Sequence, residues 1–239
     1  MLISAMHTYF KLLYNKMDSL NYPNYEPEEI DVILNQEMFK IIEQRAYGNN
    51  PKREGVEETQ KRVDDLREIT QTYVVGVNSF VSGGNQKPNG YWVPLPSDYR
   101  HAIHEECLVG YTCNGATLSK RIPVKPISHD EYNKTIRDPF KEPYTDELIR
   151  LPVQAVSGVS YFEIIGDGVI TISQYQLRYL RTPTSMQYGT TYSTPTTDVE
   201  CELAEHIHRE IVESAVRSAL ENIESPRFQT QPVIEKDKE

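Results

Sequence analysis

The sequence has few cysteines and no long apolar run. Three cysteines occur among 239 residues, an odd and small number that favours a reducing compartment over a disulfide framework. No apolar run approaches the roughly 20 residues that cross a bilayer. The first residues, MLISAMHTYFKLLYNK, lack the small-residue cleavage site of a secretion signal. We therefore expect a protein that is made in the cytoplasm and has no membrane contact.

Basic residues are also scarce. The chain has 25 Lys and Arg against 35 Asp and Glu, a formal net charge of −10. Proteins that grip nucleic acid neutralise phosphates with Lys and Arg, so this composition disfavours that role. An acidic surface suits DNA that must slide past without adhering, although acidity more often serves solubility. The one basic–aromatic cluster, QYQLRYLRTP, alternates as a strand does, with Tyr175, Leu177 and Tyr179 on the face opposite Arg178.

Signatures of catalysis are missing from the sequence. There is no G-x-S-x-G, and the glycine clusters SGGN and GDG match neither phosphate-binding pattern. His206 and His208 are two positions apart and cannot share a helical face, so solvated or capping histidines are the simplest interpretation. We expect no catalytic residues, no cofactor and no enzymatic activity. An unrecognised hydrolase that uses histidines or acidic groups is the alternative.

A metal site has one candidate segment, RHAIHEECLVGYTC, with His101, His104, Cys107 and Cys113. Its spacing, His-x2-His-x2-Cys-x5-Cys, matches no common zinc framework. In a strand, alternate side chains face opposite sides, so His101 and Cys107 would point away from His104. We expect a strand of mixed polarity and no metal site.

Helical periodicity dominates the first eighty residues. The first stripe contains Leu2, Met6, Phe10, Leu13, Met17 and Leu20. A second helix is predicted to begin at Pro27, with one side formed by Ile30, Ile33, Leu34, Met38, Ile41 and Ile42. A third, highly charged helix is predicted, and its apolar seam contains Val56, Val63, Leu66 and Tyr73.

From about residue 74 the pattern changes to β-branched and aromatic runs. The predicted strands are Arg100–Thr112, Lys120–Ile127, Pro152–Val156, Tyr161–Ile165 and Val169–Leu180. Gly166-Asp167-Gly168 predicts a tight turn between the last two.

Two long connections, 137–150 and 182–197, interrupt the strands. They lack periodicity, so we expect them to become ordered only against a partner. The candidate subunit or partner contacts within them are Phe140, Tyr144, Met186, Tyr188 and Tyr192.

A closing helix is predicted from a capping box at Thr197 and Glu200, with an apolar face that ends before Pro226. That face contains Leu203, Ile207, Ile211, Ala215, Ala219 and Ile223. The predicted fold is α+β: a helical bundle from the N-terminal helices and the C-terminal helix, with an inserted sandwich-like or barrel-like β region. The predicted parts are 1–80 (helical), 81–196 (β-rich), 197–225 (C-terminal helix) and 226–239 (flexible tail).

Five segments, in their order along nearly the whole chain, resemble a known family. They are EPEEIDVILNQEMFKIIEQR, EETQKRVDDLRE, VPLPSDYRHAI, YQLRYLRTPT and ELAEHIHREIVESAVRSALE. The pattern is similar to head–tail connector proteins of tailed bacteriophages, namely the tail-tubular (adaptor or gatekeeper) proteins of short-tailed phages. In particular, it resembles the ring proteins of crAss-like phages.

The resemblance implies a virion protein that is assembled in the host cytoplasm. Such proteins are subunits of a homo-oligomeric ring, commonly twelve-fold, stacked beneath the portal, with portal, other ring and tail proteins as partners. Helices form the body of the ring, and double-stranded DNA passes through an electronegative channel without sequence-specific binding. The family supplies no active-site residues. The implied function is therefore a structural subunit that joins the portal to the tail and lines the channel for DNA ejection. The alternative is a non-virion assembly adaptor or chaperone that binds a phage structural protein.

Overall fold

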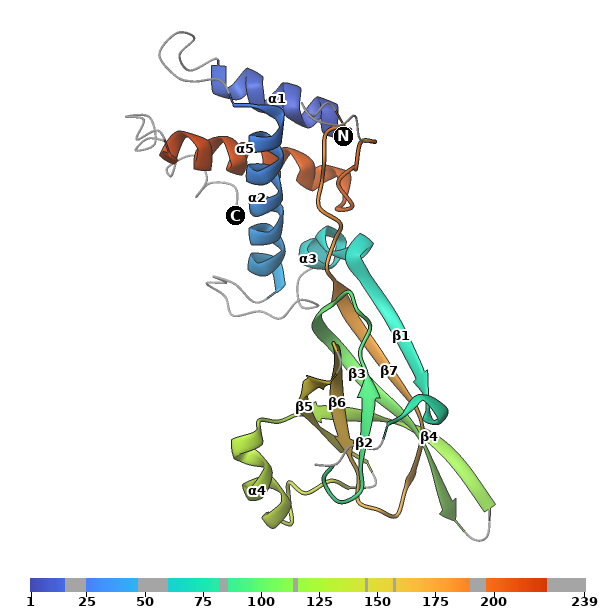
Figure 1. Ribbon diagram of the computed structural model, residues 1–239. Helices are drawn as coiled ribbons and strands as arrows, with labels where there is room; N and C mark the ends of the chain where they lie inside the picture. Colours follow the sequence, from blue (N-terminus) through green and yellow to red (C-terminus); the bar gives the residue numbers. More distant parts are fainter. Residues whose placement is uncertain are drawn as a thin grey trace. The chain divides into compact units, whose positions relative to one another are not determined.

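The protein is α+β, as predicted, and consists of two compact units. The computed structural model describes residues 1–15, 25–46, 60–81, 86–113, 116–144, 146–156, 158–189 and 197–222. Across these residues it contains five α-helices and one seven-stranded sheet (Figure 1). Met1–Ile69 and Pro183–Glu239 form what we call the helical unit, and Thr70–Thr182 forms the β unit. No helix in the described part of the chain is long and apolar enough to cross a membrane.

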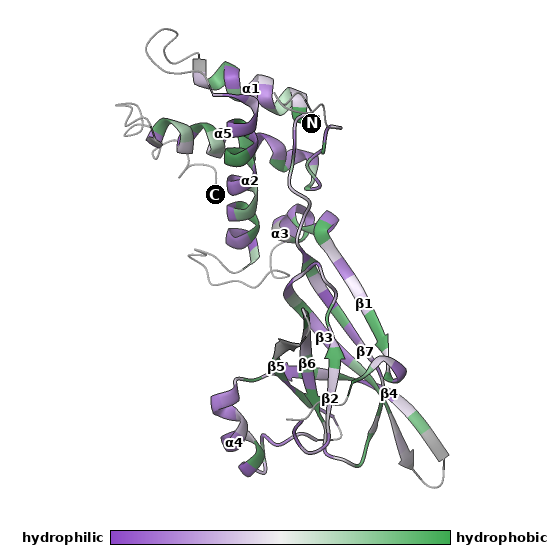
Figure 2. Ribbon diagram, viewed as in Figure 1, coloured by the Kyte–Doolittle hydropathy of each residue, from purple (hydrophilic) through white to green (hydrophobic). Residues whose placement is uncertain are grey.

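The helical unit is built on α2 (Pro27–Ala46), which begins at the predicted proline. All six predicted apolar positions of this helix are buried. Figure 2 shows hydrophobic and hydrophilic residues alternating around α2, as a helix of 3.6 residues per turn with one core-facing side requires.

Helices α1 (Ile3–Asn15) and α5 (Glu205–Asn222) both pack in this unit, and each contacts the other. On α5 the predicted face from Leu203 to Ala219 is buried, while Ile223 lies outside the described residues. In Figure 1, α1 and α5 both run across α2 rather than along it. The arrangement is therefore not clearly the bundle that the sequence predicts.

The N-terminal ends of α1 and α5 differ from the prediction. Helix α5 begins at Glu205, so the capping box at residue 197 is wrong. Instead the Glu200 carboxylate accepts the backbone N–H of Ile3 at 2.6 Å, where it compensates the positive end of α1. On α1, Met6 and Phe10 are buried as predicted, but Leu2 is 64% exposed and Ile3 fills the core instead. Met17 and Leu20 lie outside the described residues.

The third predicted helix is much shorter in the structure. Helix α3 covers only Gln60–Asp65, and a 3₁₀ turn, Arg67–Ile69, leads directly into strand β1, Thr70–Gly76. Tyr73 therefore lies in a strand, and its assignment to a helical seam is wrong. The run TQTYVVG is rich in β-branched residues, and pairing with β7 outweighs the helical spacing of the apolar positions before it.

Side chains of α2 hold the segment by which the chain returns to the helical unit. The Asn35 amide accepts the backbone N–H of Met186 at 2.7 Å and donates to the Met186 carbonyl at 2.8 Å. One turn earlier, Asp31 accepts the backbone N–H of Tyr188 at 3.0 Å and contacts the His7 ring of α1 at 2.8 Å. Two polar residues at i and i+4 on one helix thus satisfy the backbone of a segment that has no neighbouring strand at these positions.

A buried carboxylate joins α2 to α5. Glu37 accepts hydrogen bonds from Ser214 and from Ser218, the latter at 2.7 Å, and Lys40 lies 3.1 Å away. Burial by itself raises the pKa of Glu37, but the hydrogen bonds from the two serines and Lys40 outweigh it and hold the pKa below its ordinary value. The carboxylate therefore stays ionised at neutral pH and binds the two helices together.

The β unit is one curled sheet, a half-barrel, with the strand order β1-β7-β3-β4-β5-β6-β2. The five predicted strands correspond to β3 to β7, whose bounds are Tyr99–Cys113, Ala116–Pro126, Leu148–Val156, Val159–Ile165 and Thr171–Arg181. Two further strands, β1 and β2 (Gly90–Pro94), were not predicted. Neighbouring strands are antiparallel except β4 and β5. With a single sheet in the described residues, the barrel-like alternative fits and the sandwich does not.

The predicted turn at Gly166-Asp167-Gly168 is present, but it does not join a hairpin. Strand β6 pairs with β2 and β5, whereas β7 pairs with β1 and β3. The Asp167 carboxylate accepts the backbone N–H groups of Val169 and Ile170 at 2.9 and 3.1 Å, and Gly168 adopts a positive φ of 81°. The turn is therefore a connection between opposite halves of the sheet.

The inner face of the half-barrel is an apolar core that surrounds one ionic network. Tyr175, Leu177 and Tyr179 are all buried on this face, as their alternation predicts. Beside them the Tyr175 hydroxyl donates to Glu105 at 2.7 Å, and the Arg150 guanidinium lies 3.3 Å from the same carboxylate. Burial raises the pKa of Glu105, with Arg150 and Tyr175 opposing it in part, and raises that of Tyr175 further. The network links β3, β5 and β7 across the curl.

Replacing Asn35 tests the attachment of the returning segment to α2. We expect Asn35→Ala to lower the free energy of unfolding by about 1–3 kcal/mol, because the Met186 N–H and carbonyl lose their partner. Urea unfolding followed by helical circular dichroism measures this. Gln36→Ala, at an exposed neighbouring position, is the matched control and should be close to neutral. Equal effects of the two substitutions would contradict the role of Asn35.

Candidate subunit-contact surfaces

The histidine–cysteine segment forms part of strand β3, as predicted. Cys107 is buried in the core of the β unit, while His104 is exposed on the other face. Burial, reinforced by Glu105 and Glu106, raises the pKa of the Cys107 thiol well above its ordinary range, so it is no nucleophile at neutral pH. Among the described residues, no three His, Cys, Asp or Glu side chains are grouped so that they could hold a metal ion.

The second histidine pair has structural partners within the helical unit. The His206 ring contacts the buried Asp65 carboxylate at 2.7 Å, and Asp65 also pairs with Arg45 of α2 at 3.0 Å. His208 is buried, and its Nε2 lies 2.8 Å from the Leu203 carbonyl oxygen. Of the two interpretations, solvated or capping, solvation is therefore wrong for His208, which is part of the packing of α5, whereas His206 is exposed.

Phe140 is the most exposed large hydrophobic side chain in the described part of the protein, at 97%, and Tyr144 follows at 61% among the candidate contacts. Hydrogen bonds define the turn that carries them. The Asp138 carboxylate accepts the Phe140 N–H at 3.1 Å, and the Asp138 carbonyl accepts the N–H groups of Lys141 and Glu142, both at 3.0 Å. The connection 137–150 thus contains hydrogen-bonded turns, and its ordering against a partner stays a prediction.

Helix α4 (His129–Arg137) fixes the place of this turn within the β unit. Ser128 caps the helix by accepting the Glu131 N–H at 3.3 Å. Tyr132 and Ile136, one turn apart, pack against a small apolar cluster on the face of the sheet that lies opposite the main core. That cluster contains Ile127, Ile149, Leu151 and Ile165. The sequence analysis predicted no helix at these positions, because this short segment has only two apolar residues and so shows no helical periodicity.

The other three candidate contacts lie in the connection 182–197. The Met186 side chain is buried in the helical unit, at 2% exposure. Tyr188 is half-buried, and its ring lies 4.8 Å from that of His7. Tyr192 lies outside the described residues. In the single chain, Met186 and Tyr188 therefore pack against their own unit, unlike Phe140 and Tyr144.

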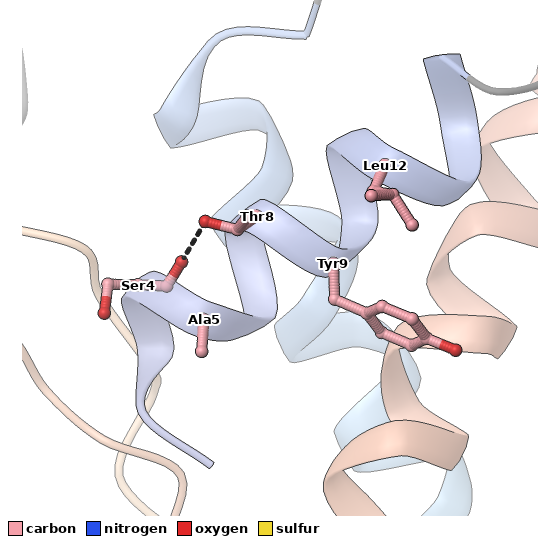
Figure 3. Close-up of a pocket in the computed structure, with 5 residues that line it drawn as sticks. All are labelled: Ser4, Ala5, Thr8, Tyr9 and Leu12. Atoms are coloured by element: carbon pink, nitrogen blue, oxygen red, sulfur yellow. Dashed lines mark hydrogen bonds between the residues drawn. The ribbon is translucent and has the colours of Figure 1, made fainter.

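The outward face of α1 is a second exposed apolar surface, which the sequence analysis did not identify. We define it by Leu2, Ala5, Thr8, Tyr9 and Leu12, on the side of α1 away from the buried Met6 and Phe10. Leu2 and Leu12 are 64% and 54% exposed. Figure 3 shows Ala5, Thr8, Tyr9 and Leu12, with Ser4, around an open hollow of about 380 Å³.

Two side chains of this face, Thr8 and Tyr9, have partners within the helical unit. The Thr8 hydroxyl donates to the Ser4 carbonyl at 2.9 Å, so its polarity is satisfied within the helix. The Tyr9 ring points toward α5 (Figure 3), where its hydroxyl approaches Glu213 at 3.4 Å and Arg209 lies over the ring. The hollow thus has the Tyr9 ring, which contacts α5, on one side and the exposed aliphatic side chain of Leu12 on the other.

The net charge of the protein resides in the helical unit. The β unit contains eleven Lys and Arg and eleven Asp and Glu, so it is neutral. The helical unit contains fourteen basic and twenty-four acidic residues, which accounts for the whole −10. The net negative charge that would repel a polyanion at long range therefore lies in this unit.

The different environments of two candidate contacts can be tested by stability. We expect Phe140→Ser to change the free energy of unfolding by no more than about 0.5 kcal/mol, because the side chain is exposed. Met186→Ala should lower it by about 2–5 kcal/mol through loss of a buried side chain. Urea unfolding of the purified protein measures both. A strongly destabilising Phe140→Ser would mean that this ring packs within its own chain.

Comparison with known proteins identifies the family of this chain. The model of the family described as phage tail ring protein 3/4 matches residues 1–227, and so spans both units. The chain is 27% identical to ring protein 4/5 of Bacteroides phage crAss001 over 219 residues, 88% of either chain. It is 23% identical to ring protein 3 of the same phage over 200 residues, 82% of this chain and 84% of that protein. The chain belongs to the phage tail ring protein 3/4 family.

Proposed function

We propose that this protein is a structural, non-enzymatic subunit of a homo-oligomeric ring in the virion neck or tail, which joins the portal to the tail. The observation that carries the proposal is the family match, because it covers both units in one alignment from residue 1 to 227. Relatives that are named ring proteins align over more than four-fifths of their length. The ring is twelve-fold, as is common for such connectors, and it contacts the portal or other ring and tail proteins.

The ring encloses a channel for double-stranded DNA, and the helical unit lines it. The charge distribution supports this assignment, since the helical unit has the entire net charge of −10 and the β unit is neutral. Repetition of a subunit around a ring multiplies each exposed carboxylate on the wall. A repeated lysine would instead add one phosphate contact per subunit, and would retain the passing DNA.

The β unit makes contacts with neighbouring proteins. Phe140 and Tyr144 are its candidates because they are exposed on a hydrogen-bonded turn, and aromatic side chains are typical anchors of interfaces. Tyr188 and Tyr192 remain candidates on the second connection, and Met186 contributes only if its segment is released from α2.

The copy number in purified virions tests the ring function. We expect several copies of the chain per particle, in one ring on the DNA axis of a reconstructed particle. Quantitative mass spectrometry of virions measures the copy number, with the portal protein as the internal standard. Absence of the chain from finished particles would replace the proposal by the non-virion adaptor or chaperone, which leaves before assembly is complete.

Charge reversal tests the channel wall. We expect at least one of Glu28→Lys, Glu205→Lys and Glu221→Lys, all exposed in the helical unit, to slow DNA ejection, and salt to restore the rate. Asp130→Lys, an equal charge change on α4 of the β unit, is the control and should leave ejection unchanged. An effect of the control alone would contradict the assignment of the wall to the helical unit.

A further inference from the structure

We propose that Phe140 of one copy inserts into the hollow on the outward face of α1 in a neighbouring copy. This contact rests on the proposed ring function and names its subunit interface. It uses one feature from each unit, a projecting aromatic ring on the β unit and an apolar hollow on the helical unit.

Hydrogen bonds and two prolines hold the backbone of Phe140, so its exposed ring has a defined position. Its N–H is bound by Asp138, the following two N–H groups return to the Asp138 carbonyl, and Tyr144 and Glu147 pair through their backbones at 2.9 and 3.3 Å. Pro139 and the buried Pro143 restrict the backbone on either side. These hydrogen bonds and prolines restrict the turn, which limits the conformational entropy that is lost when the ring is buried. An aromatic side chain on such a support is typical of an interface anchor.

Helix α1 has apolar side chains on both sides. Its inner side packs in the core through Met6 and Phe10, and its outward face exposes Leu2 and Leu12. Thr8 and Lys11 are exposed on the same helix, so it is not apolar all round. The inner side has its partner in the same unit, and burial of the exposed Leu2, Ala5 and Leu12 against a partner from outside would be favourable.

The hollow suits a planar aromatic ring. It is a shallow, largely open hollow of about 380 Å³ on one helix, on which a phenyl ring can lie over Ala5 between Tyr9 and Leu12 (Figure 3). The Tyr9 ring forms a wall against which a second ring can pack edge to face.

Charge favours the pairing of these two surfaces. Residues 138–147, which carry Phe140, contain four carboxylates and one lysine. Residues 1–15, which carry the hollow, contain Lys11 and no carboxylate, in a unit that is otherwise strongly acidic. Beside the hollow, Glu213 and Arg209 of α5 pair with each other at Tyr9, so their charges offset, and the exposed Lys11 supplies the attraction for the acidic turn.

A second copy is the occupant because each copy carries both halves of the contact. A projection and a hollow at different places on one molecule form a head-to-tail contact, and such contacts close into a ring when the rotation allows. A contact of this kind is what a homo-oligomeric ring requires, and a partner of another sequence would leave one half of each pair unused.

Photocrosslinking from position 140 tests the contact. p-Benzoylphenylalanine is placed at 140 in the full-length protein, which is assembled into virions together with an isotopically heavy copy. We expect crosslinks to peptides within residues 1–15, and mixed light–heavy products that prove contact between copies. The matched control is the same group at Val169, which is 79% exposed on another turn of the β unit and should not reach residues 1–15.

Two substitutions test the energetics. Phe140→Ala and Ala5→Trp, which fills the hollow, should each weaken association of subunits by about thirtyfold, as for a buried aromatic anchor. Gln36→Trp, at an exposed site on α2, is the control for an added indole. Incorporation of each variant into particles, in competition with the unaltered chain, gives the measurement.

The outcomes separate this contact from the ring function. If the chain is present in the virion ring but position 140 crosslinks to the portal, to another tail protein, elsewhere on a copy or not at all, the contact is wrong and the ring function stands. Crosslinks within a single chain also overturn it. If the chain is absent from virions, the ring function itself fails, and the contact with it.

Discussion

The helical unit depends on how α2 binds the chain where it returns from the β unit. The unit is assembled from two stretches of sequence that are separated by more than a hundred residues. Asp31 and Asn35 lie one turn apart on α2 and bind the backbone of Tyr188 and Met186. Without these bonds the returning segment would bury unpaired backbone groups. The β unit can therefore be inserted into the sequence of the helical unit without loss of the helical core. After the insertion, α5 packs with α1 and α2.

Buried ionic groups extend this attachment through the helical unit. Glu37 binds two serines of α5, and Asp65 binds Arg45 and His206, so α2, α3 and α5 are joined by charged hydrogen bonds as well as by apolar packing. Such groups give little net stability compared with apolar packing, but removing one partner leaves a buried charge unpaired. They therefore fix which helix faces meet. This specificity matters in a subunit whose outer surface must repeat identically around a ring.

The sequence predicted those parts of the fold in which periodicity and packing agree. The six apolar positions of α2 are all buried, and the alternation in QYQLRYLRTP correctly gave the inner face of β7. The prediction failed where a partner that is distant in the sequence determines the local structure. Strand β1 continues a helical spacing and becomes a strand because β7 lies beside it. Glu200 was taken as part of a capping box for α5, but it binds the first turn of α1. Neither partner is close in sequence, so no local pattern could identify it.

For the candidate surfaces too, local sequence pattern and distant partners had different effects. Phe140 and Tyr144 are exposed in a turn rich in prolines and charges, a composition typical of surface turns, and their role as contacts stays a prediction. Met186 stands in an equally irregular segment, yet it is buried, because Asn35 draws its backbone onto α2. The outward face of α1 was missed because the periodicity of its leucines suggested one stripe. In the structure the core takes Met6 and Phe10, and leaves Leu2 and Leu12 outside.

The buried carboxylates explain why the function is sought on the surface. The described residues contain five: Asp31, Glu37, Asp65, Glu105 and Glu163. Each has a partner in the same unit, either a side chain or, for Glu163, the backbone N–H of Lys87. A general acid or base must instead be within reach of a substrate proton. Because these groups are used to join helices and strands, the polar interior serves the shape of the subunit. The exposed aromatic turn, the apolar face of α1 and the acidic helical unit are then the features on which the proposed contacts and the proposed channel rest.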